Sequence, residues 1–165
     1  SGELKSGVYE LVLSKPVKYG NYITAKWAGM AVLIFVSLLV GFLGSYYYVQ
    51  ILFGDLAFST FITAFFIYFV YLLFFITIAV FVNTWFNRPG MVFFLTFVLT
   101  IVVDIITSIF GHYLTWSPGH ISSYVFDLLK TDSIPSETWG TLGVTAILIV
   151  IMLYLATSIL RKKEL

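Results

Sequence analysis

Four long runs of apolar residues, separated by short polar breaks, dominate the chain. Each run has more than about 20 residues, which at about 1.5 Å per helical residue is enough to cross about 30 Å of hydrocarbon. The runs are apolar on every face of a helix, whereas the strands of a membrane β-barrel alternate in polarity. The pattern predicts an all-α membrane protein with four transmembrane helices, at about 27–49, 56–82, 89–114 and 139–160.

Two segments outside these runs are amphipathic. In residues 1–22, apolar side chains recur on one helical face and Pro16 ends the helix at about Lys15. In residues 113–138, a start signal at Ser117-Pro118 precedes apolar residues at helical spacing, namely Ile121, Tyr124, Val125, Leu128 and Leu129. We predict a cytoplasmic amphipathic helix in a segment 1–22 that precedes a transmembrane domain 23–165. Before the last span we predict an interfacial helix that lies along, or dips into, the outer leaflet.

The distribution of basic residues predicts the orientation. All of the nine Lys and Arg residues except Lys130 lie before the first span, between the second and third, or after the last. By the positive-inside rule, we expect a multi-pass protein of the cell membrane with both ends of this chain in the cytoplasm. We expect Trp27 and Trp85 to mark the inner interface, and Trp116 and Trp139 the outer one.

Composition narrows the function further. Hydrophobic residues make up 60% of the chain and charged residues 10%, against roughly 45–50% and roughly 25% in soluble domains. A soluble, disordered or nucleic-acid-binding protein is excluded, and the surroundings are membrane lipid. The chain has no cysteine, no phosphate-binding loop, no GxSxG and no HExxH. We therefore predict no catalytic residue, no cofactor site and no metal site, and we do not expect this chain to be an enzyme.

One ionisable side chain, Asp104, lies well inside a predicted span. It belongs to a polar stripe on one face of the third span, which consists of Thr96, Thr100, Asp104, Thr107 and Ser108. An intramembrane carboxylate is a functional candidate by default, so this stripe is a possible translocation path. Alternatively Asp104, which we expect in the outer third of the span, is structural and anchors the outer helix through Lys130 or a hydroxyl.

Two further patterns predict packing. Ser37, Gly41 and Ser45 have the spacing that lets helix backbones approach closely. An aromatic run in the second span, from Phe65 to Phe75, fills the core or faces lipid rather than forming a path.

Three segments, which lie within residues 3–26, 83–94 and 115–129, together resemble the type-2 exporter family of ABC transporter permeases. The first matches at Ser6, Gly7, Glu10, Leu11, Leu13, Ser14, Pro16, Val17 and Lys26, and departs at Val8, Tyr19, Asn21 and Ala25. The others are the polar loop within residues 83–94 and the outer Ser-Pro segment within residues 115–129. The resemblance covers essentially the whole chain and maps it onto the last four spans of a six-span permease. Because the chain starts at Ser1 rather than Met, we expect a fragment or a processed chain.

The resemblance implies a function and partners. The first amphipathic helix would be the coupling helix that docks on a separate cytoplasmic ATPase subunit, with contacts from Tyr9, Glu10, Leu11, Leu13, Ser14 and Pro16. ATP and Mg would bind that ATPase, and two permease chains, identical or different, would enclose the path of an exporter. The alternative is a structural membrane-anchor subunit of a larger complex such as a respiratory assembly.

Overall fold

The computed structural model describes residues 19–54, 57–86 and 88–163, and within these ranges the regular structure is helical. The elements are α2 (Tyr19–Phe53), α3 (Phe58–Trp85), α4 (Pro89–Phe110), the 3-10 helix η1 (Pro118–His120), α5 (Ile121–Thr131) and α6 (Glu137–Lys163). Four of them, α2, α3, α4 and α6, are long and apolar enough to cross a membrane. The prediction of an all-α protein with four membrane spans is confirmed.

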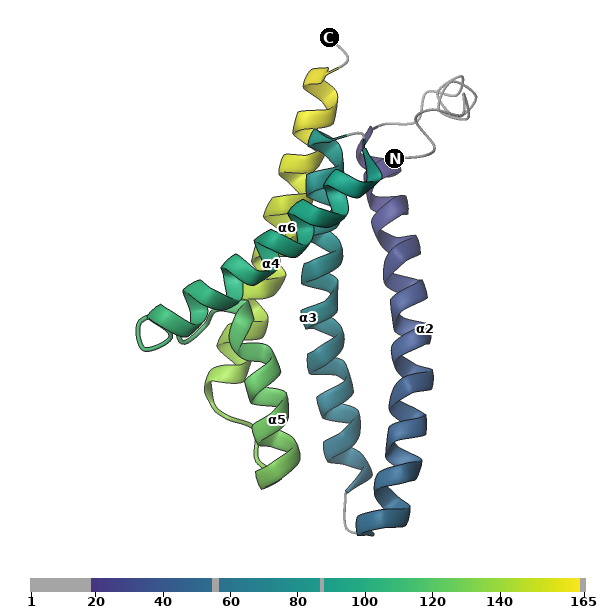
Figure 1. Ribbon diagram of the computed structural model, residues 1–165, viewed down its shortest axis with the longest axis vertical. Helices are drawn as coiled ribbons and strands as arrows, with labels where there is room; N and C mark the ends of the chain where they lie inside the picture. Colours follow the sequence, from purple (N-terminus) through teal and green to yellow (C-terminus); the bar gives the residue numbers. More distant parts are fainter. Residues whose placement is uncertain (1–18, 55–56, 87, 164–165) are drawn as a thin grey trace.

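The helices form a bundle around α3. This helix contacts α2, α4, α5 and α6, and 44% of its most apolar window is buried, against 0% in α2 and 6% in α4. In Figure 1, α2, α3 and α6 run along the long axis, whereas α4 crosses at a slant. The start of α2, the α3–α4 connection and the end of α6 lie at the same end of the bundle, as an even number of spans requires.

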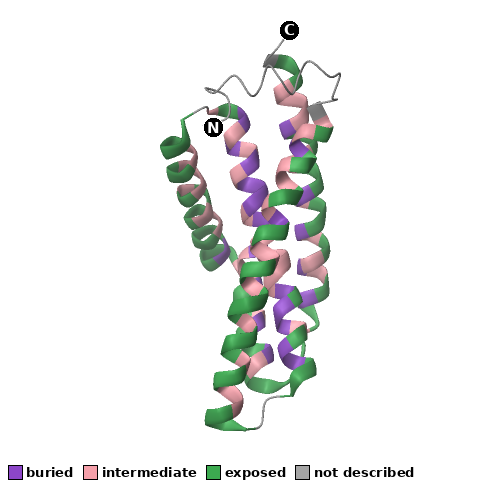
Figure 2. Cartoon of the chain, turned by 90° about the vertical axis from the view of Figure 1, so that its right-hand side faces the viewer, coloured by how far each residue is buried: buried purple, intermediate pink, exposed green. Residues whose placement is uncertain are grey.

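Three hydrophobic clusters hold the bundle together. One joins α2, α3 and α6 through Ile23, Ile76 and Ala156. Another joins α3 to α5 through Ala64, Ile67, Ile121, Val125 and Leu128. The third joins α3 and α6 through Ile78 and Ile149. Figure 2 shows that the outward surfaces of the helices are exposed, and since they are apolar they suit contact with lipid.

Helix boundaries differ from the predicted ones at both ends of α2 and at the end of α4. The helix α2 has 35 residues and begins at Tyr19, so residues 19–22, which we assigned to the cytoplasmic segment, form its first turn. It ends where Gly54, at φ +69°, supplies a left-handed residue. The helix α4 ends at Phe110 rather than near residue 114. An added Cβ at Gly111 would lie 2.7 Å from the Thr107 carbonyl oxygen and 3.1 Å from the His120 ring, so the chain turns closely against η1 here.

A helix is present where we expected the outer interfacial helix, but it packs against protein. The apolar stripe of α5 places Ile121, Val125 and Leu128 against α3, where all three are buried. At its far end, the Thr60 hydroxyl of α3 donates a hydrogen bond to the Asp132 carboxylate. The helix α5 therefore runs along the first half of α3, antiparallel to it, and its apolar stripe packs on that helix. Its position relative to the outer leaflet stays a prediction.

The small residues predicted to pack in the first span do not do so within this bundle. Ser37, Gly41 and Ser45 are all exposed on α2, and an added Cβ at Gly41 would meet nothing within 4 Å. Their spacing permits close helix contact but does not select a partner, and α3 packs on another face of α2.

Candidate functional site

The predicted coupling residues lie outside the described part of the chain. Tyr9, Glu10, Leu11, Leu13, Ser14 and Pro16 all precede Tyr19, the first described residue. Their contact with an ATPase therefore stays a prediction, and the site that the structure describes is the polar stripe of α4.

The residues of the polar stripe on α4 differ in how far they are buried. Thr96 and Thr100 are half-buried toward the bundle, and each donates a hydrogen bond to the carbonyl oxygen one turn earlier, at 2.8 and 2.9 Å. Thr107 is buried, whereas Asp104 and Ser108 are exposed. Since a helix turns about 100° per residue, the stripe is broad enough to reach from the bundle to an exposed surface.

Thr107 has a structural role. Its hydroxyl shares a hydrogen bond of 2.6 Å with the Ser117 hydroxyl. An added Cβ at Gly119 would lie 2.6 Å from the Thr107 hydroxyl oxygen, so η1 packs directly on this threonine. Thr107 fastens the connection that leads into α5, and this role accounts for its burial without a part in transport.

Asp104 lies beside the middle of α3. Its carboxylate interacts electrostatically with the Tyr71 side chain of α3. The same Tyr71 side chain forms a side-chain hydrogen bond with Ser122 of α5. Tyr71 stands at the midpoint of α3, so this interaction relates Asp104 to the middle of that helix. The helix α4 is slanted relative to α3 (Figure 1), and a tilted helix crosses less depth per residue. The depth of Asp104 in the membrane stays a prediction.

The predicted anchor between Asp104 and Lys130 does not form. The Lys130 ammonium lies over the Phe126 ring, 4.2 Å from its centroid, as a cation–π contact within α5. Among the described residues, Asp104 has no salt bridge or side-chain hydrogen bond. This removes one version of the structural interpretation and leaves a carboxylate open to a ligand, to water or to another chain.

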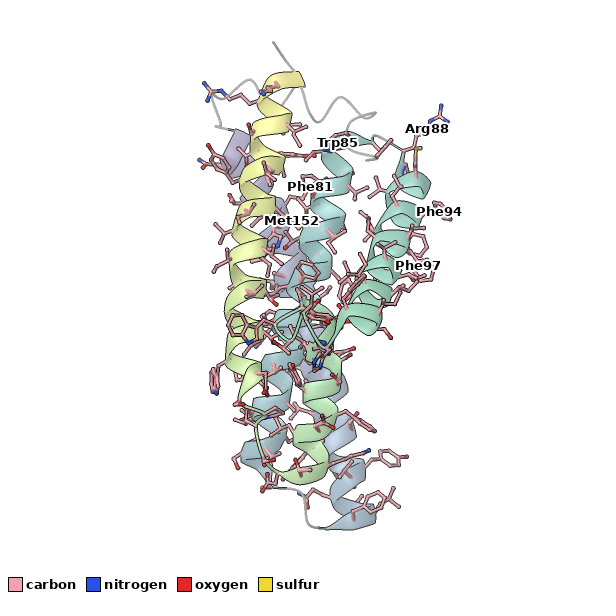
Figure 3. All side chains as sticks on the ribbon, turned by 90° about the vertical axis from the view of Figure 1, so that its left-hand side faces the viewer. Phe81, Trp85, Arg88, Phe94, Phe97 and Met152 are labelled. Carbon is pink, nitrogen blue, oxygen red and sulfur yellow. The ribbon has the colours of Figure 1, made fainter. Side chains whose placement is uncertain are left out.

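A cavity of about 310 Å³ opens between α2, α3 and α4, near the ends of these helices that we predict to lie on the cytoplasmic side. Its polar lining comes from Lys26, Asn83 and Thr96, and the rest is apolar. Thr96 thus connects the stripe of α4 to a space inside the bundle. On the same part of α4, Phe94 and Phe97 project away from the other helices (Figure 3) and are 63% and 56% exposed.

Sequence reasoning missed a polar junction on the other side of the bundle. Tyr124, which we placed on an apolar stripe, donates a hydrogen bond of 2.8 Å to the Thr115 carbonyl oxygen, and its ring stacks on His120. Burial raises the pKa of Tyr124, so its hydroxyl stays protonated and able to donate. Thr141 of α6 donates to the same carbonyl at 3.4 Å. The junction joins the α4–α5 connection to α6. It brings together residues that are far apart in sequence, such as Thr115 and Thr141, so no local sequence pattern could reveal it.

Aromatic residues of α3 fill the core, as predicted. Phe61, Phe65 and Phe74 are buried, and Phe65 meets Phe35 and Phe42 of α2 edge to face, with centroids 5.5 and 5.3 Å apart. An apolar groove of about 240 Å³ runs beside these rings between α2 and α3. Among the described residues, no group of three His, Cys, Asp or Glu side chains is placed to hold a metal ion.

Comparisons with known proteins agree with a membrane transport function. The profile of a family described as "ABC-2 family transporter protein" matches residues 1–165. The chain is also 31% identical over 121 residues to a Bacillus subtilis (strain 168) protein named "Uncharacterized transmembrane protein YxlG". That alignment covers 73% of this chain and 47% of the relative, so the chain spans about half of the relative's length. No solved structure matches the chain.

Proposed function

The chain belongs to the ABC-2 family of transporter proteins, and we propose that it forms part of an exporter driven by a separate cytoplasmic ATPase subunit. Membership makes it a multi-pass membrane permease of an ABC transporter. Export, the partner ATPase and the pairing of two permease chains are our proposals.

The polar face of α4 is the observation that carries the proposal. Thr96 opens to a cavity between three helices, and Asp104 is exposed further along the same helix. A helix that only anchors a complex in lipid gains nothing from an exposed carboxylate, which is costly to keep in hydrocarbon. In a transporter, the same side chain lines a hydrated path that a second permease chain completes.

Energy would come from the partner. The chain lacks a phosphate-binding loop, so ATP and Mg would bind the ATPase subunit. The predicted coupling residues precede α2, a continuous helix of 35 residues that begins at Tyr19, so a displacement at its start would be transmitted along the bundle. Docking of that segment on the ATPase would couple hydrolysis to movement of the path.

Substitutions that change the charge of the predicted coupling segment test this proposal. We expect Glu10→Arg or Leu11→Asp to reduce co-purification with the ATPase at least tenfold, because each change puts a mismatched charge into a protein contact. Both variants should insert in the membrane in normal amounts. Glu3→Arg is the matched control, since the resemblance assigns no ATPase contact to Glu3, and it should behave as wild type.

Unchanged behaviour of both variants would contradict the proposal. If Glu10→Arg and Leu11→Asp leave co-purification and coupled hydrolysis unchanged, this segment does not dock on an ATPase. Co-purification of the wild-type chain with redox subunits would instead support the alternative, a structural anchor of a respiratory assembly.

A further inference from the structure

The cavity between α2, α3 and α4 has a polar mouth. It holds about 310 Å³, and α3 lies between the other two helices, since both pack on it. Lys26 lines the cavity two turns from the start of α2, and Asn83 lines it in the last turn of α3. One turn further into the bundle, the lining is apolar, with Met30 on α2 and Ala79 on α3.

The deeper walls of the cavity suit a hydrocarbon chain. Val92 and Phe93 supply the wall on α4, and Phe93 is 76% exposed, so the cavity is open to what surrounds the bundle. The Thr96 hydroxyl, further along α4, already donates a hydrogen bond of 2.8 Å to the Val92 carbonyl oxygen. The inner part of the cavity therefore requires no polar group of a ligand, and a chain of methylene groups can enter it from the lipid.

The mouth of the cavity is positively charged. The Lys26 ammonium lies over the Tyr22 ring, 5.9 Å from its centroid, and Tyr22 packs against the cluster that joins α2, α3 and α6. The exposed Arg88 stands at the start of α4, directly before Pro89 of the lining (Figure 3). In the described part of the chain, every Asp and Glu lies beyond the middle of α4. An anion at this mouth would meet positive charge and no carboxylate of the lining.

This arrangement selects an anionic amphiphile. A free anion would meet mostly apolar walls, a cation would be repelled by Lys26, and a neutral apolar molecule would gain nothing from the mouth. A phospholipid with a negative headgroup fits both parts, because its phosphate oxygens accept hydrogen bonds from an ammonium and an amide while its chain lies on the walls. The cavity is at the small end of ligand pockets, which have about 300–1,000 Å³, so it holds a headgroup and the first part of a chain.

We propose that Lys26 and Asn83 bind the headgroup of an anionic phospholipid at the mouth of this cavity. The first part of an acyl chain lies between α2 and α4, against Met30 and Phe93. Basic pockets between membrane-spanning helices recognise anionic headgroups on the cytoplasmic side, which is the side that the basic residues predict for this end. The site goes beyond the proposed function and does not depend on it, since its walls come from this chain alone. A bound lipid would link membrane composition to the position of α4.

Lipid binding to the purified protein in detergent, counted by native mass spectrometry, tests the site. The probe is phosphatidylglycerol, and phosphatidylcholine is the zwitterionic comparison. We expect Lys26→Gln to weaken phosphatidylglycerol binding about fivefold, the usual contribution of one basic residue at an anionic lipid surface, and to bring it to the level of phosphatidylcholine. Lys26→Arg should retain binding within about twofold, because a guanidinium also binds phosphate. Lys162→Gln, which removes an exposed lysine of α6 outside the cavity, is the matched control and should not change binding.

A second variant tests the walls separately from the charge. Ala79→Leu puts a larger side chain into the lining and leaves Lys26 in place, so binding should fall several-fold. The unfolding temperature without added lipid separates loss of the site from loss of the fold, and it should stay at the wild-type value in Lys26→Gln. Phosphatidylglycerol should raise that temperature in wild type more than in Lys26→Gln, because a ligand stabilises the folded state that binds it.

Several results would overturn the proposal. Equal binding of phosphatidylglycerol by wild type and Lys26→Gln would show that Lys26 does not hold the headgroup, as would an equal loss in Lys162→Gln. Equal binding of phosphatidylglycerol and phosphatidylcholine by wild type would show that the site does not recognise charge. Competition by glycerophosphoglycerol, which is the same headgroup without acyl chains, would indicate a site for soluble anions instead of a lipid.

Discussion

At the scale of single residues, hydrogen bonds between helices replace the hydrophobic effect that would drive packing in water. The Trp27 indole nitrogen of α2 donates to the Thr77 hydroxyl of α3 at 2.9 Å, and Thr77 in turn donates to the Leu73 carbonyl oxygen at 2.7 Å. Trp27, which we predict at the inner membrane interface, is half-buried in the bundle. Its polar nitrogen finds a fully buried partner, which stabilises the α2–α3 contact.

We predict that Thr77→Val lowers the stability of the bundle by about 0.6–1.7 kcal/mol, the range measured for hydrogen bonds between membrane helices. Valine keeps the shape but removes the acceptor of the Trp27 bond. Thr63→Val is the matched control, because the Thr63 hydroxyl bonds only within its own helix, to the Ser59 carbonyl oxygen. A double-mutant cycle with Trp27→Phe, followed by thermal unfolding in detergent, measures the coupling. A coupling energy of zero would mean that this bond does not stabilise the bundle.

At the scale of elements, the connection from α4 to α6 depends on close backbone contacts. Gly119 of η1 lies on Thr107 of α4, and Gly140 of α6 lies on the Trp116 ring, where an added Cβ would be 2.9 Å from the indole nitrogen. A side chain at either position would collide with these groups, so the two glycines let the chain turn back and place α5 beside α3.

We predict that Gly119→Ala destabilises the protein by about 1–3 kcal/mol, the usual cost of overpacking. The new methyl group would push η1 from Thr107 and loosen the junction at Tyr124. Gly143→Ala is a suitable control, since nothing lies within 4 Å of its added Cβ and alanine favours a helix by about 1 kcal/mol. The unfolding temperature should fall in the first variant and rise slightly in the second; a rise in both would show that η1 has room to move.

At the scale of the whole molecule, the start of α2 and the ends of α3 and α6 lie together at one end of the bundle, which we call the shared end (Figure 1). The distribution of charged residues indicates which side of the membrane this end faces. The basic residues at 26, 88, 161 and 162 all belong to that end of the bundle (Figure 1). Lys130 is at the opposite end with Asp127, Asp132 and Glu137. We infer that the shared end is cytoplasmic, because positive loops are retained on that side.

Cysteine labelling tests this orientation in a chain that has no cysteine of its own. We predict that Ser133→Cys reacts with a membrane-impermeant maleimide in intact cells, because the exposed Ser133 follows α5 at the outer end. Asn87→Cys and Lys163→Cys should react only after the membrane is permeabilised. Labelling of Lys163→Cys in intact cells would reverse the orientation and would also place segment 1–22 out of reach of a cytoplasmic ATPase.

Local composition was sufficient to identify the four membrane spans, since each apolar run is long enough to cross the membrane whatever surrounds it. The start of α4 at Pro89 and the helix after Pro118 agree with the strong local preference of proline for the first turn of a helix. The polar stripe of α4 was also visible in sequence, because helical spacing alone puts Thr96, Thr100 and Asp104 on one face.

Tertiary structure alone decided which faces meet. Lipid and protein interior are both apolar, so the hydrophobic pattern of a membrane helix does not show which side packs on protein. For this reason the sequence did not reveal that Ser37, Gly41 and Ser45 face outward or that Trp27 turns inward. The slant of α4, which brings Asp104 to Tyr71, likewise depends on contacts between residues far apart in the chain, and no local preference encodes it.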